Sequence, residues 1–188
     1  MTPLCSRLIA SVVVLTCLAC GAQDPPKAPP CERECQDAVA LRALREMAKL
    51  VYNLKLQGQP VGPQDATTPC PLGGQARVFG EAYSNALQGS TEVQLSYVFE
   101  TCRYLSRDDE PGENYDMTLD GTLSQVGTLA VQPTASTALV MASESMSFAG
   151  SVYDPPLAFN ELECAVSLGQ SGNSLAGFIC DREAGLEL

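Results

Sequence analysis

The stretch from Val93 to Phe99 has the sequence VQLSYVF, and it decides the fold class of the chain. Apolar residues stand at every second position and are separated mainly by Gln94 and Ser96. Successive side chains of a strand point to opposite faces, so this period of two predicts a half-buried strand. The same alternation recurs in two later stretches: Tyr115, Met117, Leu119 and Leu123, and then Leu162, Cys164, Val166 and Leu168.

Further strands are expected near residues 75–86, 136–153 and 174–180. Turn signals rich in Gly, Pro, Asn and Asp separate the strands. They are Gln88-Gly89-Ser90, Glu110-Pro111-Gly112, Asp154-Pro155-Pro156 and Gln170-Ser171-Gly172-Asn173. About six consecutive strands with short connections predict an antiparallel meander over residues 70–188, forming a curved sheet or half-barrel.

One amphipathic helix is predicted to precede the sheet, over residues 31–57. This segment is rich in Ala, Leu, Glu, Arg and Lys, and Gly58-Gln59-Pro60 ends it. Its apolar residues recur at a spacing of three and four, which makes one stripe that can cover the apolar face of the sheet. We therefore expect a mainly β, disulfide-stabilised single domain over residues 31–188, with 61–68 as a polar connection. The stripe consists of Leu41, Leu44, Met47, Ala48 and Val51.

The chain begins with Arg7, an apolar run from Leu8 to Ala19, and then Cys20-Gly21-Ala22. Residues 14–21 resemble the lipobox of bacterial lipoproteins, although Cys17 stands where that family usually has Leu. The resemblance implies a signal peptide over residues 1–19 and a lipidated Cys20 that anchors an exported protein to the membrane. It also implies the outer membrane, because the inner-membrane proteins of the enteric family have Asp in place of Gly21. An ordinary secretory signal cut after Ala22 is the alternative, and it predicts a secreted protein.

Residues 20–30 contain Pro25-Pro26 and Pro29-Pro30 and are predicted to form a stiff tether. The apolar run before them has twelve residues, fewer than the roughly 18 that a membrane-spanning helix requires. The membrane is therefore expected to be reached through the lipid, in the bacterial cell envelope.

Nine cysteines are encoded, and six remain after Cys5, Cys17 and Cys20 are set aside. An even number in an exported domain predicts three disulfides. A hairpin centred on Gly172 pairs residues whose numbers sum to 344, which predicts a Cys164–Cys180 bond. Cys70 and Cys102 flank the expected hairpin over residues 75–99 and form the second predicted pair. Cys31 and Cys35 are left with two options: a bond to each other, or bonds to Cys70 and Cys102.

The chain contains no histidine, which excludes Ser-His-Asp and Cys-His mechanisms and histidine-based zinc sites. We find no Gly-rich phosphate loop, and we expect no cofactor and no enzymatic activity. A carboxylate-based hydrolase would need two facing carboxyl groups. The candidate glutamates occupy outward positions in the alternation of the predicted strands, which favours solvated strand faces over a catalytic pair. They are Glu81, Glu92, Glu144, Glu161 and Glu163.

An acidic cluster formed by Asp108, Asp109, Glu110 and Asp116 has the ligand type that calcium prefers, but it lacks the spacing of known calcium loops. From Pro71 onward the chain has four basic and sixteen acidic residues, a net charge of −12. This charge repels nucleic acid and anionic membrane surfaces, and it favours a protein partner with a basic surface.

Three functions are compatible with these features. The first is a non-enzymatic binding or envelope-structural lipoprotein, which the anchor, the tether and the missing catalytic residues favour. The second is a carrier of apolar ligands in a half-open barrel, by analogy with bacterial lipoprotein-trafficking factors. The third is the carboxylate-based hydrolase.

Overall fold

The computed structural model describes residues 32–59, 61–85, 87–107, 114–153 and 156–187. One helix is followed by eight strands that pair in sequence order as a single antiparallel meander. The two outer strands each have one neighbour, so the sheet is open. The predicted mainly β architecture with one covering helix is confirmed, but about six strands was too few. The elements are α1 (Arg33–Lys55), β1 (Gly62–Pro69), β2 (Gln75–Asn85), β3 (Ser90–Ser106), β4 (Tyr115–Ala130), β5 (Ala138–Tyr153), β6 (Pro156–Ser171), β7 (Ser174–Ile179) and β8 (Arg182–Glu187).

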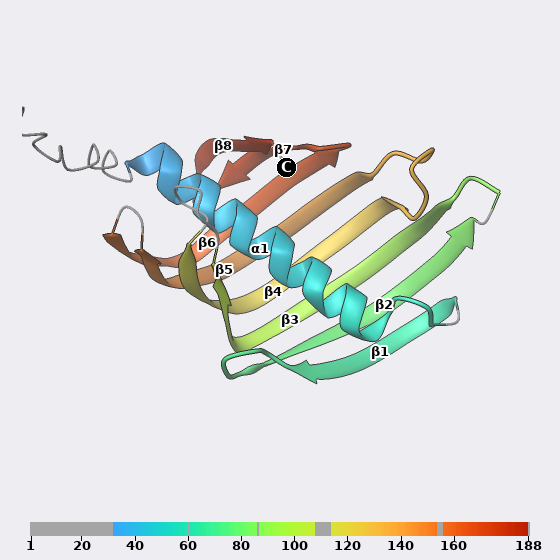
Figure 1. Ribbon diagram of the computed structural model, residues 1–188, viewed down its shortest axis with the longest axis horizontal. Coiled ribbons are helices and arrows are strands. Elements are labelled where there is room, and N and C mark those ends of the chain that lie inside the picture. Colours follow the sequence, from blue (N-terminus) through green and yellow to red (C-terminus); the bar gives the residue numbers. More distant parts are fainter. Residues whose placement is uncertain (1–31, 60, 86, 108–113, 154–155, 188) are drawn as a thin grey trace, which may run out of the picture.

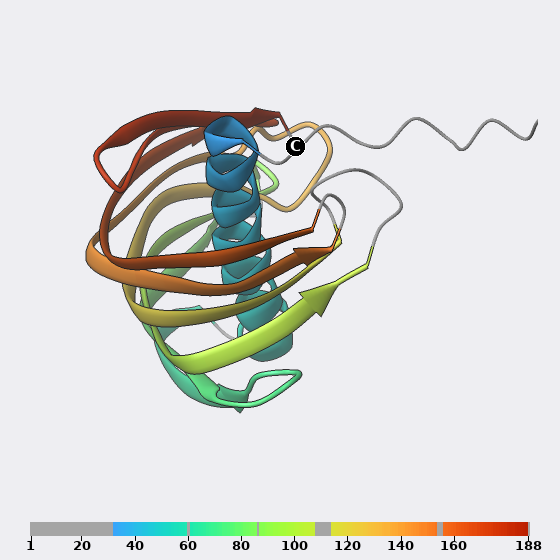
Figure 2. The same ribbon diagram turned by 90° about the vertical axis from the view of Figure 1, so that its left-hand side faces the viewer.

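The helix lies inside the curve of the sheet and crosses it diagonally (Figures 1 and 2). Its N-terminal end lies beside β8 and its C-terminal end beside β1, so α1 contacts both outer strands. All members of the predicted apolar stripe are buried. The predicted inward residues of β3 and β4 are buried as well, and together they form the core between helix and sheet. No helix in the described parts of the chain has the length and apolar character needed to cross a membrane.

The two strands that the sequence did not predict are the outer ones. β1 has the sequence GPQDATTP, which is polar and contains two prolines. Proline lacks a backbone donor and is tolerated at the edge of a sheet, where one side of the strand needs no partner. β8 has only six residues and follows β7 after a turn of two residues, Cys180 and Asp181, both with positive φ. Backbone pairing therefore defines both strands, without an apolar pattern.

In each of the strands β3 and β6, a bulge resets the inward alternation. Thr101 has a φ of 45° and Glu163 a φ of 55°, and the pairing register shifts next to both. An extra residue in a bulge reverses the faces of all residues beyond it. The prediction that Leu162 shares the inner face with Cys164 is consequently wrong, and Leu162 is 64% exposed. For the same reason Glu161 turns inward, although outward alternation was predicted for it.

Disulfides join Cys70 to Cys102 and Cys164 to Cys180, the two pairs predicted from the sequence. The predicted register is wrong by one residue, because β6 and β7 pair with numbers that sum to 345 and turn on Gly172-Asn173. Cys180 therefore lies in the β7–β8 turn rather than directly opposite Cys164. Each bond ties the turn of an outer hairpin to the next strand inward, which braces both sides of the sheet. In the chain-entropy model each contributes about 3–4 kcal/mol.

The remaining cysteine of the described chain, Cys35, is also disulfide-bonded. The pairing of the helix cysteines with Cys70 and Cys102 is contradicted, because those two bond to each other. Cys31 lies outside the described residues, as do Cys20, the predicted signal peptide and the predicted tether.

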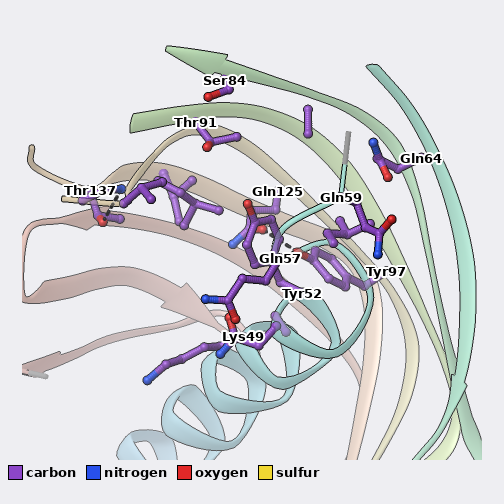
Figure 3. A pocket seen from close by; sticks show the side chains of 18 of the residues that line it. Lys49, Tyr52, Gln57, Gln59, Gln64, Ser84, Thr91, Tyr97, Gln125 and Thr137 are labelled. Carbon is purple, nitrogen blue, oxygen red and sulfur yellow. Dashed lines mark hydrogen bonds between the residues drawn. The ribbon is translucent and has the colours of Figure 1, made fainter. Parts of the chain in front are cut away.

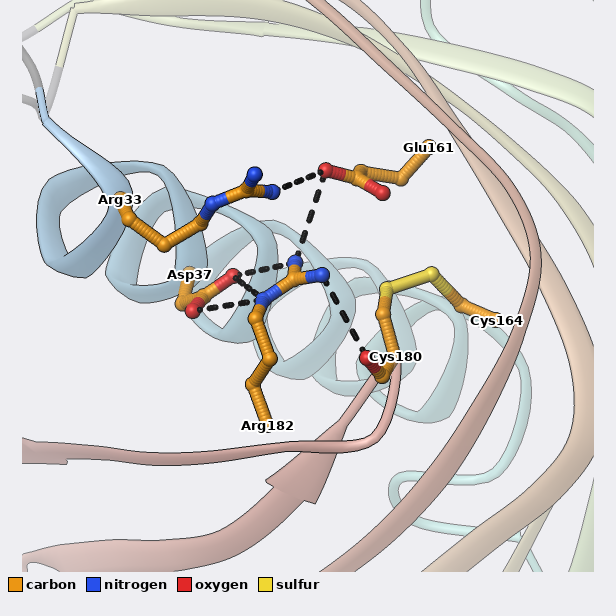
Figure 4. The surroundings of a disulfide bond; sticks show 6 residues. All are labelled: Arg33, Asp37, Glu161, Cys164, Cys180 and Arg182. Atoms are coloured by element: carbon orange, nitrogen blue, oxygen red, sulfur yellow. Dashed lines mark hydrogen bonds and ion pairs between the residues drawn. A yellow bond between two sulfur atoms is a disulfide. The ribbon is translucent and has the colours of Figure 1, made fainter.

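An ion-pair network next to the Cys164–Cys180 bond fastens the start of α1 to the sheet (Figure 4). Asp37 is buried, and its carboxylate accepts hydrogen bonds from Arg182 Nη2 at 2.7 Å and from Nε at 3.1–3.2 Å. Glu161 accepts from Arg33 at 3.1 Å and from Arg182 at 3.5 Å. Three elements, α1, β6 and β8, thus meet through complementary charges.

Candidate functional site

A cavity of about 490 Å³ lies between the C-terminal half of α1 and the concave face of the sheet (Figure 3). It lies at the end of the molecule that holds the β2–β3 and β4–β5 turns. This is the end where α1 finishes, opposite the ion pairs that fasten its first turn. The volume falls within the range of about 300–1,000 Å³ that is typical of small-molecule sites.

Small side chains create this space. Ala48 of α1 and Ala82, Ser84 and Thr91 of β2 and β3 line the cavity. Elsewhere under the helix the interior is filled by large buried side chains such as Met47, Phe99 and Tyr115. The concavity is therefore packed over most of the length of α1 and hollow only where these small residues meet.

A buried hydrogen-bonded pair forms part of the wall. The Tyr97 hydroxyl donates to Gln125 Oε1 at 2.8 Å, and both side chains come from the concave face. Burial, reinforced by Tyr52, raises the pKa of Tyr97 far above its usual value of 10, so this phenol stays protonated. The bond to Oε1 leaves the Nε2 group of Gln125 as a donor on the cavity side.

Other polar groups of the wall are also oriented by hydrogen bonds. Gln170 Nε2 donates to the carbonyl of Gly172 at 3.0 Å, which leaves its Oε1 as an acceptor. Burial raises the pKa of Tyr52, and the neighbouring Thr91 side chain partly offsets this effect. The wall thus combines oriented neutral dipoles with apolar residues, including Leu56, Leu129 and Leu139.

The charged groups of the wall are both cationic. Arg45 and Lys49 of α1 line the cavity, and in its described lining no carboxylate side chain is present. Both cations pair with Glu46, which lies outside the wall; the Lys49 Nζ to Glu46 Oε2 distance is 3.6 Å. Lys49 is 53% exposed, which places its ammonium group at the rim.

The glutamates considered for hydrolysis do not meet in this cavity. Glu81, Glu92, Glu144 and Glu163 are exposed on the sheet, and Glu161 is held by arginines at the other end of α1. None of the five lines the cavity, among the wall residues that the structure describes.

Of the acidic cluster considered for calcium, only Asp116 lies within the described residues, and its carboxylate pairs with Arg103. This arginine lowers the pKa of Asp116. Asp108, Asp109 and Glu110 lie outside the described residues.

One group of three potential metal-ligating side chains occurs in the described chain: Glu161, Cys164 and Cys180. The two sulfurs are joined to each other, so neither is a free thiolate. The carboxylate of Glu161 is already engaged by two arginines. The group is therefore a structural brace in this state of the protein.

Comparisons with protein-family models, with curated proteins and with solved structures find no match to this chain.

Sequence reasoning did not assign the polar residues of the cavity. A signal for two of them was present, because Gln125 and Gln170 continue the inward positions that end with Leu123 and Leu168. A polar amide on an otherwise apolar face requires a buried partner or a cavity. The small residues gave no comparable signal, since alanine and serine are common in any strand.

Proposed function

We propose that this protein is an exported, lipid-anchored binding protein that holds a small ligand in the cavity beneath the C-terminal half of α1. The lipobox-like residues 14–21 and the oxidised cysteines support the exported part of the proposal, since disulfides persist in oxidising compartments. The cavity supports the binding part.

The observation that carries the binding function is the construction of the wall. A pre-formed apolar cavity with a few oriented polar groups is the usual design of a small-molecule site. Here Tyr97 orients Gln125, and the carbonyl of Gly172 orients Gln170. The large apolar ligands expected of an open half-barrel carrier would need the whole concavity, which α1 largely fills. A single small molecule that fits within this one cavity is the better match.

Blocking the cavity tests this proposal. Ala82 lines the wall and is 7% exposed, so Ala82→Phe places a ring in the empty space. Ala165→Phe, at an exposed position of β6, is the matched control. The probe is N-phenyl-1-naphthylamine, whose fluorescence rises in apolar sites. We expect the unchanged chain and Ala165→Phe to bind it and Ala82→Phe to lose binding. Equal binding by all three proteins would refute the proposed site.

The anchor is tested separately. In a bacterial host supplied with radiolabelled palmitate, the unchanged chain should incorporate label and sediment with membranes. Cys20→Ala should remove the label. Label retained by Cys20→Ala, or a mature N-terminus at Gln23, would overturn lipidation at Cys20 and favour the secretory alternative.

A further inference from the structure

The charge of the cavity is opposite to the charge of the protein. The chain has a net charge of −11 and twice as many acidic as basic residues. In the described cavity wall basic residues outnumber acidic ones instead, because Arg45 and Lys49 are present without a carboxylate side chain. A ligand that enters this cavity therefore meets a positive electrostatic potential in an otherwise negative molecule.

The two cations are not fully neutralised by their surroundings. Other arginines of the described chain have acidic partners on the sheet, as Arg77 has Asp65 and Arg103 has Asp116. Among the residues that the structure describes, Arg45 and Lys49 share one carboxylate, that of Glu46. This leaves about one net positive charge at the rim. A single excess charge suits a monoanion such as a carboxylate.

Below the rim the cavity favours an apolar body. Leu56, Leu129 and Leu139 line it, and the Tyr97 hydroxyl, Gln125 Oε1 and Gln170 Nε2 are already hydrogen-bonded within the protein. Val61 and Val131 belong to the lining and are more than half exposed, which extends the apolar surface to the outside. An apolar chain can lie along these leucines, while Gln125 Nε2 and Gln170 Oε1 remain available to a polar atom of the ligand.

We infer that the ligand is an amphiphile of the fatty-acid class, with its carboxylate at Lys49 and Arg45 and its hydrocarbon chain along the leucine wall. This inference rests on the proposed binding function and adds the chemical class of the ligand. The Nε2 group of Gln125 offers one hydrogen-bond donor beside the hydrocarbon chain of the ligand, which favours ligands that carry an oxygen atom at that point.

The test compares two ligands that differ only in their head group, dodecanoate and dodecanol. Each displaces N-phenyl-1-naphthylamine from the full chain in nanodiscs of zwitterionic lipid, with empty nanodiscs subtracted. Partition into the disc is the same for every variant, so ratios between variants report the protein site. Lys49→Gln should weaken dodecanoate binding about two- to fivefold, as expected for one exposed ion pair, and leave dodecanol binding unchanged. Lys49→Glu should weaken dodecanoate binding about tenfold.

Lys55→Gln is the matched control, because Lys55 is on the same helix but does not line the cavity. It should change neither affinity. The inference is overturned if Lys49→Glu leaves dodecanoate binding intact, if it weakens dodecanol equally, or if Lys55→Gln has the same effect as Lys49→Gln. If the fluorescent probe does not bind the unchanged chain at all, the proposed function fails. If the probe binds and only the neutral competitor, dodecanol, displaces it, the ligand class alone fails.

Discussion

The ion pair between Arg182 and Asp37 should be one of the most stabilising charged contacts of the described fold. The Asp37 side chain is 6% exposed, and the Arg182 guanidinium satisfies both of its oxygens. Arg182→Gln would leave a buried carboxylate without its cation. Breaking a fully buried pair costs about 3–5 kcal/mol. Because Arg182 is 27% exposed, water can reach the carboxylate in the variant, and we expect a loss of about 2–3 kcal/mol.

Arg77→Gln is the matched control. Arg77 donates to Asp65 through Nε at 2.8 Å and Nη2 at 2.7 Å, a more regular geometry than that of Arg182. Both partners are more than half exposed, so solvent screens the pair. We expect a clearly smaller loss of stability than for Arg182→Gln, despite the better geometry.

Urea unfolding with the disulfides intact measures both changes. The double variant Asp37→Asn with Arg182→Gln removes the stranded charge and should recover part of the loss. An equally large loss for Arg77→Gln would show that burial does not decide the strength of these ion pairs. A double variant no more stable than Arg182→Gln alone would show that the buried carboxylate of Asp37 is not the source of the loss.

Three further predictions concern pH and the backbone. The pKa of Asp116 is lowered by its arginine partner, so the stability that Asp116 contributes is present above about pH 4 and is lost as the pH falls through its folded-state pKa. In urea unfolding, the difference in stability between the unchanged chain and Asp116→Asn should therefore disappear on acidification. Burial raises the pKa of Tyr104 and Tyr115, so their contribution is complete below about pH 10 and is lost at higher pH; absorbance at 295 nm should show these phenols ionising only with unfolding, and earlier ionisation would contradict their burial. Gly127→Ala should cost about 2 kcal/mol or more in thermal unfolding, because φ is +135° and the new Cβ would lie 2.2 Å from a β5 carbonyl oxygen. At Gly169 the nearest atom to a new Cβ is 3.9 Å away, so Gly169→Ala should be neutral or stabilise the protein by about 0.4–1 kcal/mol.

The central part of the fold was predictable because its side chains carry a strong local signal. The alternation around Val93–Phe99 and the helical stripe around Leu44 both placed their apolar residues correctly in the core. The Cys164–Cys180 bond was predicted from a register that is off by one residue. The pairing was still correct, because a disulfide can link a turn residue to a neighbouring strand as well as two directly opposed residues.

The candidate site was less predictable. Gln125 and Gln170 were visible as polar residues on inward positions, but the space beside them depends on alanines and a serine from elements far apart in sequence. Whether small residues leave a cavity or bring their elements closer together depends on how α1 crosses the sheet. Asp37 and Arg182 fix one end of that crossing, where the helix begins.

The spacing of apolar side chains was sufficient to determine from the sequence that this chain makes a helix-covered antiparallel sheet. These side chains recur at every second position in the strands and at every third or fourth position in the helix. Backbone conformation and long-range contact decided the rest. Thr101 and Glu163 adopt left-handed conformations that reverse the inward face, and β1 and β8 exist only because a neighbouring strand supplies their hydrogen bonds. These choices depend on partners distant in the chain, which a local pattern cannot record.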